Sequence, residues 1–150
     1  EARWPRLVVF DLDYTLWPLW VDTHVDPPLK RTQHINQVVD RYGDAHSHSG
    51  ADSHYRSTIQ FRTCRATHAS EILFQLRQNN VKIGAASRTQ APSVAKQALA
   101  GLMITPPASQ EPPVSALSLF DYMEIYPGSK VAHFRRLAQL SEIPFHDMRT

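Results

Sequence analysis

The chain has 150 residues, a length typical of one domain built around a single hydrophobic core. Hydrophobic residues make up 42% and charged residues 20%, which indicates a globular rather than a disordered protein. The formal net charge is only +2, with no block of like charges, and no apolar run approaches the roughly 18 residues of a membrane span. We therefore expect neither a nucleic-acid nor a membrane partner.

Cysteine usage bears on the compartment. Cys64 is the only cysteine, so a disulfide within the chain is excluded and a reducing, cytoplasmic location is the simplest expectation. Residues 1–7 lack the apolar segment of a signal peptide, and the chain lacks a starting Met. Because it also ends abruptly at Thr150, both ends look cut.

The first predicted element is a strand over residues 7–10, where four apolar residues lead directly into Asp11 and Asp13. Residues 18–28 contain three prolines and are predicted to form a loop. Segment 31–66 is polar and without clear periodicity, and is interpreted as a variable insertion whose composition suits disorder, with a short strand at 57–61.

Beyond this insertion, helical and strand patterns alternate. The predicted order is a helix at 67–80, a strand at 81–87, a helix at 92–101, a proline-rich connection at 105–116, a strand at 119–126 and a helix at 130–140. This βαβ alternation is typical of an α/β fold with a Rossmann-like parallel sheet, here as one domain over residues 1–150.

Polar side chains follow the predicted strands at their carboxyl ends, where ligands bind in such sheets. Asp11 and Asp13 follow the first strand, the turn into Lys130 follows the third, and the second strand ends on Ser87, Arg88 and Thr89. Two carboxylates held close repel each other unless a proton or a cation lies between them, and Mg²⁺ prefers such oxygen ligands. A carboxylate can also attack phosphorus, a second can move a proton, and Ser87 with Lys130 could hold phosphoryl oxygens.

These motifs resemble those of the haloacid dehalogenase-like (HAD-like) superfamily: "DLDYT" fits its DxDxT signature, "AAS" its second motif and the Lys of "YPGSK" its third. Longer blocks, "VFDLDYTLWPLWVDTHVDPP" and "EIYPGSKVAHF", resemble its small eukaryotic magnesium-dependent phosphatases. The resemblance implies a domain that is capless or carries a small flap, Mg²⁺ as cofactor, and hydrolysis of phosphotyrosine-type or sugar phosphates through an aspartyl-phosphate. We expect a monomer.

The resemblance also assigns roles to individual residues. It implies that Asp11 is the nucleophile and a magnesium ligand, and that Asp13 is the general acid and base and ligates the metal through its carbonyl. It further implies that Ser87 and Lys130 bind the phosphoryl group and that Arg88 binds substrate. Tyr14, Trp17 and Trp20 are expected at the entrance, although Trp17 and Trp20 are equally compatible with the core.

One part of the family pattern is absent. The fourth motif, an acidic pair at the end of a further strand, should come just beyond Met148, and Asp147 is not a substitute because it precedes that strand. We therefore expect the C-terminal strand to be missing and residues 7–10 to form an exposed edge. The alternative function is a truncated, inactive phosphatase-like protein that binds phosphate or a partner without turnover.

Four further residues, three histidines and one cysteine, have no catalytic or metal-binding role assigned to them. His46 and His48 have no further ligands at zinc spacing and are interpreted as solvated loop residues. Cys64 has no assignable activating partner and is interpreted as structural or incidental. For His24, contact with substrate and a hydrogen bond that fixes the loop are both open.

Overall fold

A computed structural model describes residues 3–42, 58–61, 69–107 and 110–150. Its centre is a parallel sheet in the order β8-β5-β1-β9. The strands are β1 (Leu7–Phe10), β5 (Lys82–Ser87), β8 (Tyr122–Ile125) and β9 (Met148–Arg149). In register, Val8 lies opposite Ile83, and Gly84 lies opposite Tyr122. The predicted α/β fold with a parallel sheet is confirmed.

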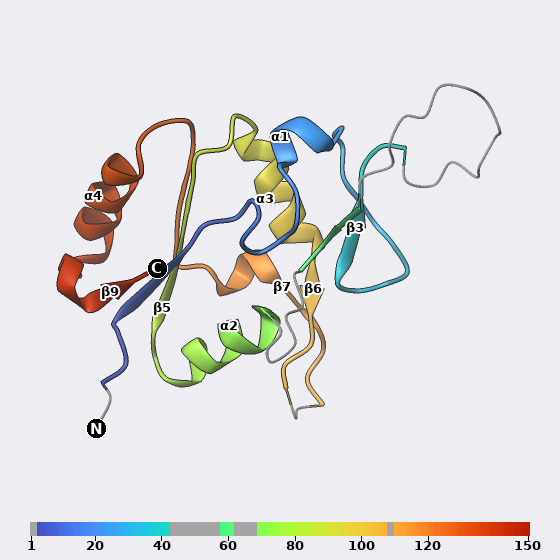
Figure 1. Cartoon of the computed structure of the whole chain (residues 1–150). Helices are drawn as coiled ribbons and strands as arrows, with labels where there is room; N and C mark the ends of the chain where they lie inside the picture. The colour runs from blue at the N-terminus through green and yellow to red at the C-terminus, as the bar shows by residue number, and fades with distance from the viewer. Residues whose placement is uncertain (1–2, 43–57, 62–68, 108–109) are drawn as a thin grey trace.

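Helices cover both faces of this sheet (Figure 1). On one face lies α4 (Lys130–Ser141), and on the other lie α2 (Ala69–Gln78) and α3 (Pro92–Gly101). Side chains of β1 alternate between them, since Leu7 packs in the cluster that contains Leu137 of α4, whereas Val8 packs against the larger cluster that contains Leu99 of α3. The sheet is therefore buried on two sides, which explains its continuous apolar strands.

Local sequence signals set the helix ends. Pro92 occupies the first turn of α3, and the Ser129 hydroxyl accepts a hydrogen bond from the Ala132 amide (3.1 Å) at the start of α4. After α2, Asn80 takes a left-handed conformation with φ 56°. The predicted bounds of α3 and the start of α4 are confirmed.

A second, antiparallel sheet in the order β2-β3-β4 lies within the predicted insertion. It contains β2 (Lys30–Arg31), β3 (Gln37–Val39) and β4 (Thr58–Gln60), and Val38 and Ile59 are buried in the core. The expectation of disorder is therefore wrong for 31–42 and 58–61, and the strand at 57–61 is confirmed at 58–60. Residues 43–57 and 62–66 lie outside the described residues.

Five short elements depart from the predicted loops and connections. Helix α1 (Val21–His24) forms within the predicted loop, and β6 (Met103–Ile104) pairs with β7 (Val114–Ser115) around the proline-rich connection. Two 3-10 turns, η1 (Ala116–Leu119) and η2 (Phe145–Asp147), precede β8 and β9. Only α1 among these elements borders the pocket described below.

The C-terminal strand differs from the sequence expectation. Strand β9 pairs in parallel with β1, with Met148 opposite Leu7 and Arg149 opposite Val8. The prediction that this strand is missing and that β1 is an exposed edge is therefore wrong for Leu7 and Val8. Asp147 lies before β9, as expected, within 3.7 Å of the guanidinium groups of Arg3 and Arg6.

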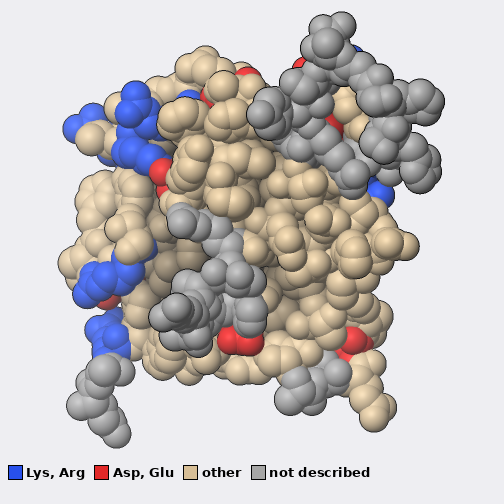
Figure 2. Space-filling view, turned by 45° about the vertical axis from the view of Figure 1, so that its right-hand side comes forward, with Lys and Arg blue, Asp and Glu red and all other residues tan. Residues whose placement is uncertain are grey.

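On the face drawn in Figure 2, most of the visible Lys and Arg side chains lie in separate groups along the left margin, with some acidic side chains beside them. Among the described residues, no helix is long and apolar enough to cross a membrane.

Candidate active site

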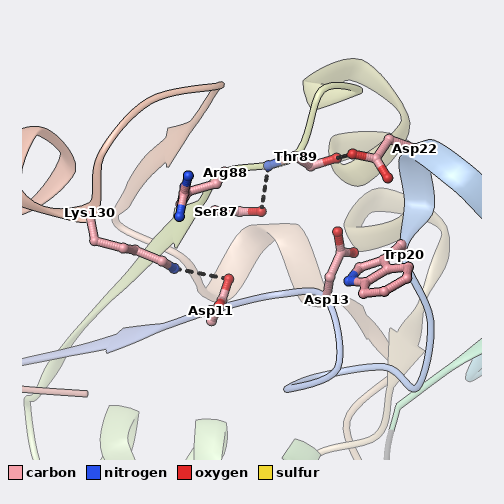
Figure 3. A pocket seen from close by; sticks show the side chains of 8 residues that line it. All are labelled: Asp11, Asp13, Trp20, Asp22, Ser87, Arg88, Thr89 and Lys130. Carbon is pink, nitrogen blue, oxygen red and sulfur yellow. Dashed lines mark hydrogen bonds and ion pairs between the residues drawn. The ribbon is translucent and has the colours of Figure 1, made fainter.

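A cavity of about 230 Å³ opens at the carboxyl end of the parallel sheet. Six of the side chains that line it were predicted from the sequence: Asp11, Asp13, Trp20, Ser87, Arg88 and Lys130. Figure 3 shows them converging from β1, α1, β5 and α4 on one space. Asp22 and Thr89 complete the lining. The sequence prediction that these strand ends converge is confirmed in space.

Asp11 faces a cation. The Lys130 ammonium lies 3.0 Å from Asp11 Oδ1 and also donates to the Ala86 carbonyl, while the Leu12 amide donates to the same Asp11 oxygen (2.9 Å). These contacts hold the carboxylate at the end of β1 with about half of its side chain exposed to the pocket. A carboxylate in this setting is fixed and accessible, as a nucleophile must be.

Asp13, in contrast to Asp11, is surrounded by other side chains and lies near negative charges. Burial raises its pKa above the ordinary value of an aspartic acid, and the negative charges of Asp22 and Asp11 raise it further, against hydrogen bonds that lower it. Those bonds come to Oδ1 from the Trp17 indole nitrogen (2.7 Å) and the Val21 amide (3.3 Å). A carboxyl group with a raised pKa, two residues from an accessible carboxylate, suits proton transfer.

Ser87 and Arg88 continue the pocket beyond β5. Ser87 is buried (1% exposed), and its hydroxyl oxygen lies 3.4 Å from the Thr89 amide, which donates to it. Arg88 is exposed, and its guanidinium extends along the same side of the cavity as Lys130 (Figure 3). Two cations and a hydroxyl therefore border the space in front of Asp11, an arrangement that favours an anion with several oxygens.

The two tryptophans divide between core and pocket. Trp17 is fully buried, so the core is the correct one of the two placements left open for it, whereas Trp20 is 52% exposed and lines the cavity. The indole of Trp20 stacks on the His24 ring (5.7 Å between centroids, 12°) and meets Tyr14 edge-on (5.1 Å, 77°). The His24 Nδ1 also accepts from the Trp20 amide (3.1 Å). His24 thus fixes the loop, one of the two roles left open.

Asp22 was missed by the sequence reasoning, whereas Thr89 was expected at this strand end but was given no role. Asp22 Oδ2 accepts hydrogen bonds from the Gln90 amide (3.0 Å) and the Thr89 hydroxyl (3.3 Å), which joins α1 to the turn after β5. No pattern in residues 18–28 indicated that Asp22 turns back toward that strand end, because α1 depends on tertiary contacts.

Comparison with known proteins identifies the family. A family model described as "Acid Phosphatase" matches residues 3–149. The chain belongs to this family. It is 38% identical to a HAD-like hydrolase superfamily protein of Schizosaccharomyces pombe, over 99% of this chain and 75% of the relative. It is also 38% identical to human magnesium-dependent phosphatase 1, over 98% of this chain and 66% of the relative.

A solved structure agrees in fold. The crystal structure of the N-terminal part of a Bacteroides fragilis protein, which contains a phosphatase domain and is complexed with Mg, aligns with 97% of this chain and 30% of that chain. The TM-score is 0.55 at 15% identity, which supports the shared fold alone. On the family model and the curated relatives, this chain is a HAD-like member of the phosphatase family, and its relatives include a protein named as a magnesium-dependent phosphatase.

The donor atoms in the pocket of this phosphatase-family chain fit a hard cation. Asp11 offers a carboxylate oxygen, and Asp13 would contribute its backbone carbonyl, as the family resemblance implies; both are the oxygen donors that Mg²⁺ takes. Within the described residues, no cluster of three or more His, Cys, Asp or Glu side chains could hold a metal ion. Mg²⁺ commonly keeps several waters, so two aspartates suit a partly hydrated ion. His46, His48 and Cys64 lie outside the described residues.

Proposed function

We propose that this chain is a magnesium-dependent phosphatase that hydrolyses phosphomonoesters through a phosphorylated Asp11. The observation that supports this function best is the pairing of an accessible Asp11 carboxylate, held beside Lys130, with Asp13, whose pKa is raised in the same pocket. This combination separates a nucleophile from a proton donor two residues apart. The family relationship supports the same reaction class.

In the first step, an oxygen of Asp11 attacks phosphorus and forms a new P–O bond. The bond between phosphorus and the leaving-group oxygen breaks, and its electron pair stays with that oxygen. Protonated Asp13 delivers its proton to the oxygen, so an alcohol or phenol leaves rather than its anion. The raised pKa of Asp13 keeps that proton available to higher pH than an ordinary aspartic acid would.

In the second step, the proton-accepting role passes to the Asp13 carboxylate. Asp13 takes a proton from a water molecule, whose oxygen attacks phosphorus and displaces Asp11. Inorganic phosphate leaves, Asp11 is restored as a carboxylate, and Asp13 is protonated for the next cycle. Protons and bonds therefore balance over the two steps without a further reactant.

The remaining side chains bind and orient the phosphoryl group. Lys130 and Arg88 offset negative charge on its oxygens, and the buried Ser87 hydroxyl donates to one of them. Asp11 and the Asp13 carbonyl would hold Mg²⁺, which would supply additional stabilisation of the negative charge on the phosphoryl group. The exposed Trp20 indole gives the leaving group an apolar surface, which suits phosphotyrosine-type and sugar phosphates. A monomer in the cytoplasm remains our expectation for the assembly and location.

The decisive experiment is turnover of an aryl phosphate with Mg²⁺, with EDTA, and with the Asp11→Asn variant. We expect hydrolysis that needs both the metal and Asp11, and unchanged thermal melting of the variant. Asp26→Asn is the matched control, because Asp26 is exposed and does not line the pocket. Cooperative melting and stabilisation by phosphate without turnover would instead support the inactive, phosphate-binding alternative.

A further inference from the structure

We infer that Asp22 is a positioning residue that fixes Trp20 relative to the phosphate-binding turn (residues 87–90), and so determines the preference for leaving groups with a flat ring. This inference rests on the proposed phosphatase function. It concerns two parts of one pocket that come from different elements: Ser87 is the last residue of β5 and Arg88 follows it, whereas Trp20 directly precedes α1. Their relative position must be fixed if a substrate is to meet both at once.

Helix α1 is too short to hold its own orientation. It has four residues, far below the roughly 12 that an isolated helix needs to be even marginally stable in water. Its Asp22, Thr23 and His24 are exposed, and only Val21 is buried. The orientation of α1 therefore depends on contacts to other elements.

Asp22 supplies such contacts on the side of the phosphate-binding turn. Its Oδ2 accepts from the Gln90 amide at 3.0 Å and from the Thr89 hydroxyl at 3.3 Å, and Figure 3 shows this carboxylate directed at Thr89. The hydrogen bond from the Gln90 amide is the main reason that the pKa of Asp22 is lowered, so the carboxylate is charged and the bond charge-assisted.

The turn that Asp22 binds is itself anchored. The Thr89 hydroxyl accepts from the Ala91 amide (3.2 Å), directly before α3, and the side chains of Ala95 and Leu99 in α3 are fully buried. The Thr89 amide donates to the Ser87 hydroxyl (3.4 Å). Asp22 thus binds the same turn, residues 87–90, that carries the Ser87 hydroxyl.

The position of Trp20 depends on the position of α1, through the backbone and through the rings that contact the indole. It is two residues before Asp22, and its ring lies between the stacked His24 ring and the edge of Tyr14. These contacts limit the rotation of the indole, so a shift of α1 moves the whole aromatic surface. Loss of the Asp22 hydrogen bonds is therefore expected to weaken binding of a ring but not of phosphate.

The test compares Asp22→Ala with Asp22→Asn. An Asn amide oxygen can accept from Gln90 and Thr89, and its NH₂ can donate to the Thr23 hydroxyl, which now lies 3.0 Å from Asp22 Oδ1. Asp22→Ala should raise the KM for an aryl phosphate about tenfold, whereas Asp22→Asn should stay within about twofold of the wild type. The KM for glycerol phosphate and the inhibition constant for inorganic phosphate should not change in either variant. Asp26→Ala, an exposed aspartate outside the pocket, is the matched control.

A double variant tests the route through Trp20. If Asp22 acts by placing this ring, Trp20→Ala should raise the aryl-phosphate KM about as much as Asp22→Ala, and the double variant no further. Thr89→Val, which removes one of the two donors, should shift the same KM by less and provides an independent test if Asp22→Ala fails to fold. Additive effects, or equal impairment by Asp22→Asn and Asp22→Ala, would overturn the inference.

Amide hydrogen exchange separates this inference from the proposed function. Exchange of the Gln90 amide, measured without substrate, should accelerate about tenfold in Asp22→Ala, since its acceptor is lost. If the wild-type chain shows no metal-dependent turnover, the proposed function fails while this result still stands. If Gln90 exchanges equally in both proteins, the positioning role of Asp22 is wrong even where turnover is normal.

Discussion

The Lys130 ammonium lies 3.0 Å from Asp11 Oδ1 and joins the first turn of α4 to the carboxyl end of β1. Both side chains are more than a third exposed (37% and 46%), so their attraction is screened by water and adds little to the stability of the fold. The contact between Lys130 and Asp11 matters for the reaction instead. A cation beside the attacking oxygen places the carboxylate and stabilises the negative charge that gathers there when phosphorus is attacked.

Removal of this cation should affect catalysis far more than folding. We expect Lys130→Met to lower kcat for an aryl phosphate by about 100-fold, because one charge-stabilising donor is lost, while Tm changes by less than about 3 °C. Val131→Ala, an adjacent and largely exposed position, should leave kcat unchanged. Steady-state kinetics and thermal melting measure both quantities. A large fall in Tm with a proportionate fall in kcat would instead assign Lys130 a structural role.

The sequence was sufficient for three strands of the parallel sheet and for most of the site. The strands β1, β5 and β8 are mostly apolar segments separated by helical periodicity, and polar residues lie at or beyond their carboxyl ends. Because parallel strands align these ends at one edge, residues as distant as Asp11 and Lys130 could be placed together before the fold was known. Their individual roles came from the family resemblance.

The remaining elements depend on contacts between distant segments. Strands of two or three residues carry no periodic signal: Lys30 and Arg31 are exposed and polar, and become β2 only by pairing with Val39 and Val38 of β3. The same holds for β9, whose Met148 pairs with Leu7. Asp22 was missed because nothing in its neighbourhood showed that α1 would reach residues 89 and 90.

The environment of Asp121 predicts that the stability of the fold falls at acid pH. Burial raises its pKa, but hydrogen bonds from the Ile83 amide, Arg77 and Lys82 outweigh that effect, and the pKa is lowered overall. Arg77 binds both carboxylate oxygens (3.1 and 2.9 Å). Because the folded-state pKa lies below the unfolded value of 3.8, this stabilisation is complete above that value and is lost as the pH falls through the folded-state pKa.

Asp121→Asn should therefore lower the free energy of unfolding by about 2 kcal/mol at neutral pH, since a hydrogen-bonded charge with two cationic partners is removed. The difference from the wild type should shrink below about pH 4. Urea unfolding at both pH values measures it. Asp147→Asn is the control, because its ion pairs to Arg3 and Arg6 are long (3.7 Å) and should contribute little. A difference that is independent of pH would contradict the charge-based explanation.

Gly101, the last residue of α3, predicts a close contact between that helix and the second sheet. A Cβ atom at this position would collide with Cγ1 of Val38 in β3, a side chain that is 1% exposed and has little room to move. Gly101→Ala should therefore destabilise the fold by about 2 kcal/mol despite the better helix propensity of alanine, as overpacking of a close-packed core does. Gly84→Ala in β5 is the control, because its Cβ would meet Leu7 at an ordinary 3.5 Å.

A variant of Val38 tests whether its contact with residue 101 causes the loss of stability. In a Val38→Ala background the colliding methyl group is gone, so adding Gly101→Ala should cost nothing further or restore part of the lost stability. Urea unfolding of the two single variants and the double variant gives the coupling energy, which should be about 1–2 kcal/mol in favour of the double variant. An equal loss from Gly101→Ala in both backgrounds would show that β3 does not pack on α3 in this way.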